Sequence, residues 1–342
     1  MVCTGDKSFG RGATPASGGV PPASMGSPPA SSGAPPALEV KRYSLKDRKS
    51  KVELSLQGVP HAAGGLFSAF IAKLPKTLAA DDLRTAAQNI VAAGHAGRPV
   101  ILGMGAHPIK VGLSPIIIDL MERGIVTALC TNGASAVHDF EMALAGFTSE
   151  DVAHALDDGS FGMAEETGVM LNGAISEGVR KGFGFGRAVG EFIQSDEIFR
   201  HRDVSIFAAA YRLGLPLTVH VAVGTDIIHM HPEADGAAIG QGSLRDFKIL
   251  VGQVAGLEGG VFINLGSAVI IPEVFLKAIN LARNTGSTVD KFTAVNMDFI
   301  RHYRAHENVL KRPTKNGGTA LSIVGHHEIM LPLLAAAVIE GF

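Results

Sequence analysis

The chain has 342 residues and a formal net charge of -2, with 46% hydrophobic and 18% charged residues. This balance is typical of a globular protein with a large core. The net charge argues against nucleic-acid binding, and the sequence has no basic stripe of the length that such binding needs. Two cysteines, Cys3 and Cys130, are too few for a disulfide framework or a cysteine metal site, so we expect a reducing, cytoplasmic compartment. The apolar segment Ile329–Ile339 is shorter than the roughly 20 residues that cross a bilayer, so we expect a core helix and no membrane partner.

Residues 1–38 consist mostly of Gly, Ala, Pro and Ser. Such a segment buries too little apolar surface to offset the entropy of ordering it, so we predict a disordered tail. The tail also lacks the apolar stretch of a signal peptide, which argues against secretion. Residues 39–342 are predicted to form a single domain.

The first periodic segments predict a helix and then a buried strand. Residues 82–94 have the pattern of an amphipathic helix closed by Gly94. The apolar run Pro99–Leu102 is typical of a buried parallel strand, and it ends in Gly103 and Gly105. We therefore expect a strand-to-helix turn there of the kind that cradles nucleotides.

A second unit of the same kind follows directly. Ser114 is expected to cap a helix that ends before Gly124, and Ile125–Cys130 is a second buried strand. The turn Thr131–Gly133 then leads into a helix that Ser135 is expected to cap. Two parallel strands joined in this way end at the same edge of a sheet, where open α/β sheets bind their ligands.

The segment 148–190 is rich in glycine and less regular. Gly184, Gly186 and Gly190 are spaced somewhat like a dinucleotide-binding fingerprint. No strand precedes them, so we expect the likeness to be superficial.

Later apolar runs predict four more strands: Leu215–Val223, Gly259–Leu265, Lys291–Met297 and Thr319–Val324. Helices are expected to begin near Ser243, with Asp246 in a capping-box position, and near Pro272. Polar residues follow six predicted strands: His107, Asn132, Asp226 with His229, Ser267, Asp298 and His326. The pattern predicts an α/β fold with a doubly wound, mostly parallel, Rossmann-like sheet that binds a ligand at one edge.

Residues 98–340 resemble the deoxyhypusine synthase family, whose NAD-dependent enzymes move the aminobutyl group of spermidine onto a protein lysine through an enzyme-lysine imine. The stretches that carry the resemblance are GMGAHPIKVG, TNGASAVHD, SIFAAAYRLGLPLTVHVAVGTD, GGVFINLGSAVI with LARNTG, and SIVGHHEIMLPLLAAAVIE. The resemblance implies a single NAD-binding, doubly wound domain. It also implies a homo-oligomer, a tetramer or a dimer, with sites between subunits.

The resemblance places NAD at the strand-to-helix turns. Thr131–Gly133 offers N–H groups at a helix start, which suits an anion or a ribose, whereas ordinary turn chemistry is the alternative. His326 or His327 stands where the family has an acid that contacts NAD. The expected cofactor-binding residues are Gly103, Gly105, His107, Thr131, Asn132, Gly133, Gly266, Ser267 and His326.

The substrate pocket is expected to depart from the family. The resemblance implies an acidic polyamine pocket with a tryptophan beside the imine-forming lysine, but this chain has no tryptophan. The corresponding stretch, residues 299–318, has one acid, Glu307, among five cations: Arg301, Arg304, Lys311, Arg312 and Lys315. Like charges would repel a polyamine, so we expect a small anion-bearing substrate. The lysine of the imine is expected to be Lys311 or Lys315, unless both are simply solvated.

The loop after the third strand holds the densest group of potential metal ligands: Asp226, His229, His231, Glu233 and Asp235. We favour a polar loop without a metal, because the family uses none. Asp226 and His229 are then expected to be catalytic, with His229 accepting a proton.

Three functions remain open. The leading one is an NAD-dependent enzyme, a transferase or oxidoreductase, that acts on a small anion-bearing substrate. The first alternative is a true deoxyhypusine or homospermidine synthase. The second is a non-enzymatic NAD-binding scaffold or sensor.

Overall fold

The computed structural model describes residues 38–341, and the chain divides into two units, residues 1–51 and 52–342. In the first unit, the described residues 38–51 are exposed and hold one 3-10 helix, η1 (Leu45–Asp47). Apart from Leu38, the predicted tail lies outside the described residues. The single domain from residue 39 to 342 stays a prediction.

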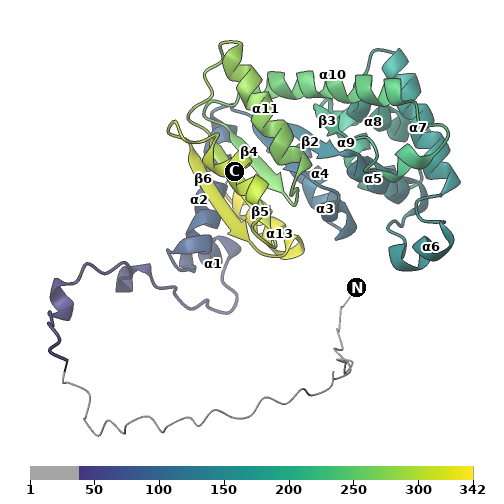
Figure 1. Cartoon of the computed structure of the whole chain (residues 1–342). Helices are drawn as coiled ribbons and strands as arrows, with labels where there is room; N and C mark the ends of the chain where they lie inside the picture. The colour runs from purple at the N-terminus through teal and green to yellow at the C-terminus, as the bar shows by residue number, and fades with distance from the viewer. Residues whose placement is uncertain (1–37, 342) are drawn as a thin grey trace, which may run out of the picture. The chain divides into compact units, whose positions relative to one another are not determined.

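One six-stranded sheet organises the second unit, in the order β3-β2-β1-β4-β5-β6 (Figure 1). Its strands are β1 (Val100–Met104), β2 (Ala128–Asn132), β3 (Leu217–His220), β4 (Val261–Leu265), β5 (Thr293–Asp298) and β6 (Thr319–Val324). All five neighbouring pairs are parallel. Each strand overlaps a predicted apolar run, so the doubly wound, Rossmann-like fold is confirmed. The strand order reverses between β1 and β4, which is where such sheets bind ligands.

The helices lie between and beyond the strands. The first half of this unit contains η2 (Leu54–Leu56), α1 (Phe67–Lys73), α2 (Leu78–His95), α3 (His107–Lys110), α4 (Ser114–Glu122), α5 (Gly133–Ala145), α6 (Val152–Asp158), α7 (Glu165–Arg180) and α8 (Phe185–Ser195). The second half contains η3 (Arg202–Val204), α9 (Ile206–Leu213), η4 (Ile227–Met230), α10 (Gly236–Ala255), α11 (Ile270–Asn284), α12 (Tyr303–Ala305), the π-helix η5 (His306–Lys311) and α13 (His327–Ile339).

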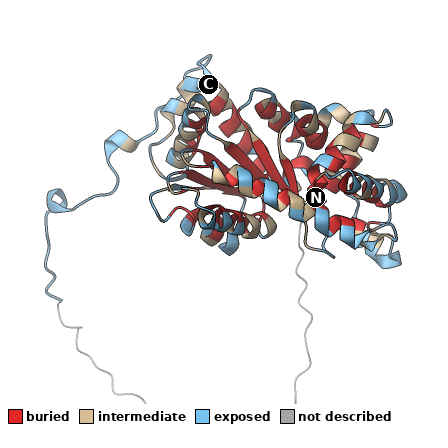
Figure 2. Cartoon of the chain, turned by 90° about the horizontal axis from the view of Figure 1, so that it is seen from above, coloured by how far each residue is buried: buried red, intermediate tan, exposed pale blue. Residues whose placement is uncertain are grey.

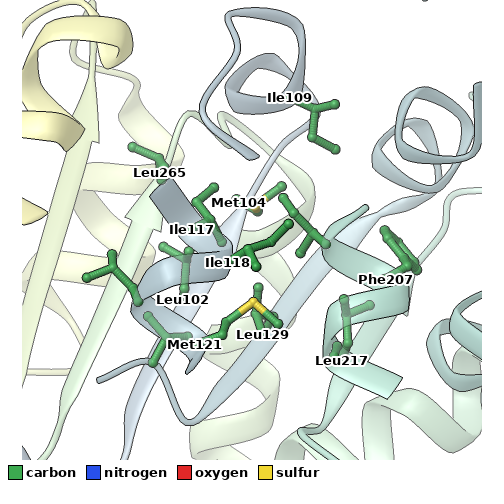
Figure 3. Packing of buried hydrophobic residues seen from close by; sticks show 14 of the residues in the cluster. Leu102, Met104, Ile109, Ile117, Ile118, Met121, Leu129, Phe207, Leu217 and Leu265 are labelled. Atoms are coloured by element: carbon green, nitrogen blue, oxygen red, sulfur yellow. The ribbon is translucent and has the colours of Figure 1, made fainter. Parts of the chain in front are cut away.

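The sheet separates two hydrophobic cores, because successive side chains of a strand point to opposite faces. In β1, Leu102 joins the core with α2, α4, α9 and α13, whereas Ile101 joins the core with α10 and α11. Figure 2 shows the buried strands between covering helices, and Figure 3 shows Leu102 and Leu129 packed near Ile117 of α4. Burial on both faces explains why the central strands β1 and β4 are almost continuously apolar, whereas the edge strand β6 is partly exposed.

Several predicted helix starts are wrong by a few residues. Helix α5 begins at Gly133, because the side chain of Asn132 caps it by accepting the N–H of Ser135 at 3.1 Å. Helix α10 begins at Gly236 and not near Ser243, because Asp235 already caps it there. In both cases an earlier Asn or Asp provides a good acceptor for the free N–H groups of the first turn.

The three glycines of the fingerprint-like segment pack helix α8. A Cβ atom on Gly190 would lie 2.6 Å from the carbonyl oxygen of Phe207 in α9, and one on Gly186 would overlap the carbonyl of Leu217 in β3. Gly184 similarly has no room beside Asp246. Close packing therefore accounts for the spacing.

Asp246 lies on the inner face of α10 and not in the predicted capping box. Its Oδ2 accepts the backbone N–H groups of Gly186 and Val219, each at 2.8 Å, which joins α10 to α8 and β3. Burial raises the pKa of Asp246 to about 7, although these hydrogen bonds oppose the shift.

We expect this carboxyl group to make stability pH-dependent. Because its pKa is higher in the native than in the unfolded chain, the native state binds more protons between about pH 4 and 7, and the free energy of unfolding falls as pH rises. Asp246→Asn keeps an oxygen that accepts these hydrogen bonds but cannot ionise. The substitution should therefore reduce the decrease in the free energy of unfolding between low and neutral pH by roughly 1–3 kcal/mol. Urea unfolding at pH 5 and pH 8 measures it, and identical pH slopes in both proteins would contradict the assignment.

Candidate functional site

The turns after β1 and β4 meet where the strand order reverses. The N–H of Gly105 donates to the carbonyl oxygen of Leu265 at 3.2 Å, and a Cβ on Gly105 would lie 2.8 Å from the carbonyl oxygen of Gly266. Gly266 has a φ of +65°, in the left-handed region that favours glycine. Both turns therefore need glycine, which leaves bare backbone at this edge.

Two other predicted cofactor residues at these turns have structural partners. A Cβ on Gly103 would lie 2.7 Å from the side chain of Ile271 and 3.1 Å from Sγ of Cys130, so its glycine serves core packing. Ser267 is buried, and its hydroxyl accepts the N–H of Ile271 at 3.2 Å in the first turn of α11.

Three rings form a cluster at the same edge. His107 lies 5.3 Å from His327 and 5.9 Å from Phe299, measured between ring centroids, and Phe299 lies 5.9 Å from His327. Burial lowers the pKa of His327, and the neighbouring Asp298 carboxylate only partly opposes this. Among the described residues, Nδ1 of His327 and Oδ1 of Asn264 are buried without a hydrogen-bond partner. Unpaired buried polar atoms of this kind are candidates for contact with a bound molecule.

The predicted anion site after β2 is already occupied by the chain itself. The hydroxyl of Thr131 donates to the carbonyl oxygen of Met104 at 2.9 Å, and Asn132 caps α5. A Cβ on Gly133 would overlap the carboxylate of Asp226. Asp226 thus stands at the start of α5, where a phosphate would otherwise bind.

Asp226 and His229 lie close together at the start of η4. Nδ1 of His229 accepts the N–H groups of Gly224 at 3.1 Å and Asp226 at 3.2 Å. Burial raises the pKa of Asp226, whereas His229 and the N–H of Ala134 lower it. In the described chain, Oδ2 of Asp226 and Nε2 of His229 have no hydrogen-bond partner.

His231 is turned to a different partner. Its Nε2 lies 2.8 Å from the carbonyl oxygen of Gly162. Within residues 38–341, no three His, Cys, Asp or Glu side chains come together as a metal site.

A cavity of about 910 Å³ lies next to Asp226, against α5 and α7. Its polar lining includes four carboxylates and two basic side chains: Glu141, Glu150, Glu166, Asp226, Lys110 and His138. Apolar side chains supply the rest of the wall, among them Val137, Leu144, Phe147, Val152, Phe161 and Met170. A largely apolar cavity with convergent polar groups is the usual form of a small-molecule site.

A hydrogen-bonded group lies in the wall of this cavity. The hydroxyl of Thr148 donates to Oε2 of Glu141, and the hydroxyl of Thr167 donates to Oε1 at 3.0 Å. Nδ1 of His138 lies 2.6 Å from Oγ1 of Thr148. Burial would raise the pKa of Glu141, but the His138 ring, 3.7 Å away, and the hydrogen bonds from Thr148 and Thr167 outweigh it and keep the pKa below its usual value. Glu141 is therefore ionised.

The cations of the basic segment are mostly paired. Lys311 lies 3.2 Å and Arg312 3.6 Å from carboxylate oxygens of Glu307, and Arg304 lies 3.3 Å from Glu273. These contacts neutralise charge that the sequence suggested was free for a substrate.

The two lysines of the predicted site are exposed. Lys315 precedes Asn316, whose amide donates to Asp290 just before β5 begins. Lys315 therefore lies at the edge where the strands start, opposite the edge where Asp226 and His229 lie. His326 follows β6, is 72% exposed in its side chain, and lies 3.8 Å from Glu328.

Sequence reasoning missed the group around Glu141. His138 and Glu141 are three residues apart in a predicted helix, so their shared face could have been noticed. Thr148 and Thr167 come from other segments, and their pairing depends on the tertiary structure.

The comparisons with known proteins concern the fold. No protein-family model and no curated protein matches the chain. It is similar to AgrE in a ternary complex with ornithine and NAD+, with 16% identity, a TM-score of 0.47, and coverage of 75% of this chain and 32% of AgrE. It is also similar to a conserved candidate LOR/SDH protein from Methanococcus maripaludis S2, with 16% identity and a TM-score of 0.46. That match covers 90% of this chain and 76% of the other. A third similar structure is a candidate deoxyhypusine synthase from Entamoeba histolytica, with 12% identity and a TM-score of 0.49. That match covers 83% of this chain and 96% of the other.

The fold and the site define a doubly wound α/β protein with polar residues gathered where its strands end. The chain spans about a third of AgrE, 32% of its length. At these identities and TM-scores the likenesses do not assign a family, so the deoxyhypusine synthase family stays a resemblance. Within residues 38–341, no helix has the length and apolar character needed to cross a membrane.

Proposed function

We propose that this chain is an NAD-dependent enzyme that acts on a small substrate. The observation that carries the proposal is the close approach of Gly105 and Gly266 where the strand order reverses. Glycines at such a turn let a dinucleotide reach the backbone without meeting a side chain. The unpaired Nδ1 of His327 beside these turns fits the same ligand.

The residues that would hold NAD are those of the two glycine turns and the rings beside them. Gly105 and Gly266 would offer backbone contacts, and His107 would cover the cofactor from α3. When bound, NAD supplies a nicotinamide ring that accepts a hydride from a substrate. In this proposal, Thr131, Asn132 and Gly133 shape the neighbouring turn and His326 borders the site.

The cavity beside Asp226 is the proposed substrate site. Its four carboxylates outnumber its two basic side chains, and Glu141 is ionised. An amine-bearing substrate with an apolar body complements such a wall better than an anion does. This charge favours the alternative of a synthase acting on a polyamine over the anion-bearing substrate expected from the basic segment.

A thermal-shift screen in the presence of NAD separates these two substrate classes. We expect spermidine and diaminobutane to raise the melting temperature, because a ligand that prefers the native state stabilises it. Small carboxylates and phosphorylated metabolites should have little effect. Glu141→Gln should abolish the amine response, whereas Glu165→Gln, an exposed change at the start of α7, should retain it. A response to anions alone would contradict an amine substrate.

The oligomer and the covalent lysine remain predictions of the resemblance. Neither Lys311 nor Lys315 lines the cavity, so an imine on either with a substrate bound there would require the site of a second copy. Borohydride trapping with an amine substrate and NAD, followed by peptide mapping, tests this. Modification of neither lysine would exclude them as covalent participants.

A further inference from the structure

We propose that Nε2 of His138 is the base that removes a proton from a molecule bound in the cavity, and that His229 does not have this role. The inference rests on the proposed function in taking this cavity as the site of an amine substrate that loses a hydride. Its support is the pattern of hydrogen bonds around the two imidazole rings.

The tautomer of His138 can be deduced from its contact with Thr148, because the Thr148 hydroxyl has one proton and can donate only one hydrogen bond. That hydroxyl proton is donated to the Glu141 carboxylate, which is ionised and can only accept. The Thr148 oxygen is therefore left as the acceptor for the ring of His138, 2.6 Å from Nδ1. Neutral His138 must then carry its proton on Nδ1.

A proton on Nδ1 leaves a free lone pair on Nε2. The side chain of His138 is 14% exposed and lines the cavity, so this nitrogen is held in place but accessible. Glu141, acting through Thr148, fixes the orientation of the ring and favours the imidazolium that forms. A carboxylate that orients a histidine in this way is a common arrangement for a general base.

His229 has the opposite pattern. Its Nδ1 lone pair already accepts two backbone N–H groups, so the neutral ring carries its proton on Nε2. Nε2 can then donate but cannot accept. Protonating Nδ1 instead would break both backbone hydrogen bonds, so we assign His229 to shaping the loop.

The step is a simple proton transfer. An N–H bond of a bound ammonium breaks, its electron pair stays on the substrate nitrogen, and an Nε2–H bond forms on His138. An ammonium must lose a proton in this way before a hydride can leave the adjacent carbon. The charged groups that share the cavity wall with His138 are Glu141, Lys110, Glu150, Glu166 and Asp226, and their net negative charge stabilises the imidazolium.

The test begins with the tautomers, which require neither ligand nor cofactor. Nitrogen-15 NMR of the histidine rings at high pH should show His138 protonated on Nδ1 and His229 on Nε2. Thr148→Val removes the acceptor and should shift His138 toward the Nε2 tautomer. A wild-type His138 that carries its proton on Nε2 would overturn the proposal.

Formation of NADH provides the second readout. In a single turnover with diaminobutane and NAD, His138→Gln should slow NADH formation at least about 100-fold, whereas His229→Gln should retain most of it. NAD affinity should stay within about two-fold of the wild type in both variants. An equal rate in wild type and His138→Gln would overturn the proposal. Failure of the wild-type protein to bind NAD would instead count against the proposed function.

Discussion

Asp139→Ala should lower the free energy of unfolding by about 3–5 kcal/mol, because it leaves several buried donors without an acceptor. The carboxylate of Asp139 is fully buried and accepts the hydroxyl of Ser205 and the N–H groups of Ile206, at 2.8 Å, and Phe207, at 3.3 Å. It therefore caps helix α9 from α5 and ties the two elements together.

Urea unfolding at pH 7.5 measures this effect. The matched control is Asp119→Ala in α4, which removes only an exposed ion pair with Arg123 at 2.8 Å and should leave the free energy of unfolding almost unchanged. Equal losses in the two variants would show that the buried cap contributes no more than a surface ion pair.

Gly105→Ala should weaken NAD binding about 100-fold, because the new methyl group would push apart the two turns that approach the cofactor. The ideal Cβ position lies 2.8 Å from the Gly266 carbonyl oxygen, and that atom belongs to backbone that cannot rotate away. Calorimetric titration with NAD measures the change.

Gly173→Ala is the control for this substitution. Gly173 lies inside α7, and a Cβ added there would meet no neighbouring side chain or element within 4 Å, so alanine fits and should favour the helix. NAD affinity should then match the wild type. Unchanged affinity in a folded Gly105→Ala protein would remove Gly105 from the cofactor site.

The strands could be predicted because burial imposes short apolar runs, each of which is followed by glycine or polar residues of a turn. The starts of α5 and α10 were harder to predict, since Asn132 and Asp235 compete with later Ser residues as caps. Choosing among such caps depends on where the preceding loop positions the chain.

The candidate site was only partly accessible from sequence. The glycine turns follow strands directly, so Gly105 and Gly266 could be located. The sequence did not show whether the charge of Lys311 is available to a substrate, because its ion pair with Glu307 forms only in the folded helix. The tautomers of His138 and His229 were equally out of reach, because both depend on partners set by the fold.

Binding of NAD where the strand order reverses is tested most directly by a crystal structure grown with NAD. We expect electron density for a dinucleotide against the turns of Gly105 and Gly266, with a ring near His107 and Phe299. Density for NAD at any other place on the chain, or none at a millimolar concentration of NAD, would contradict this assignment.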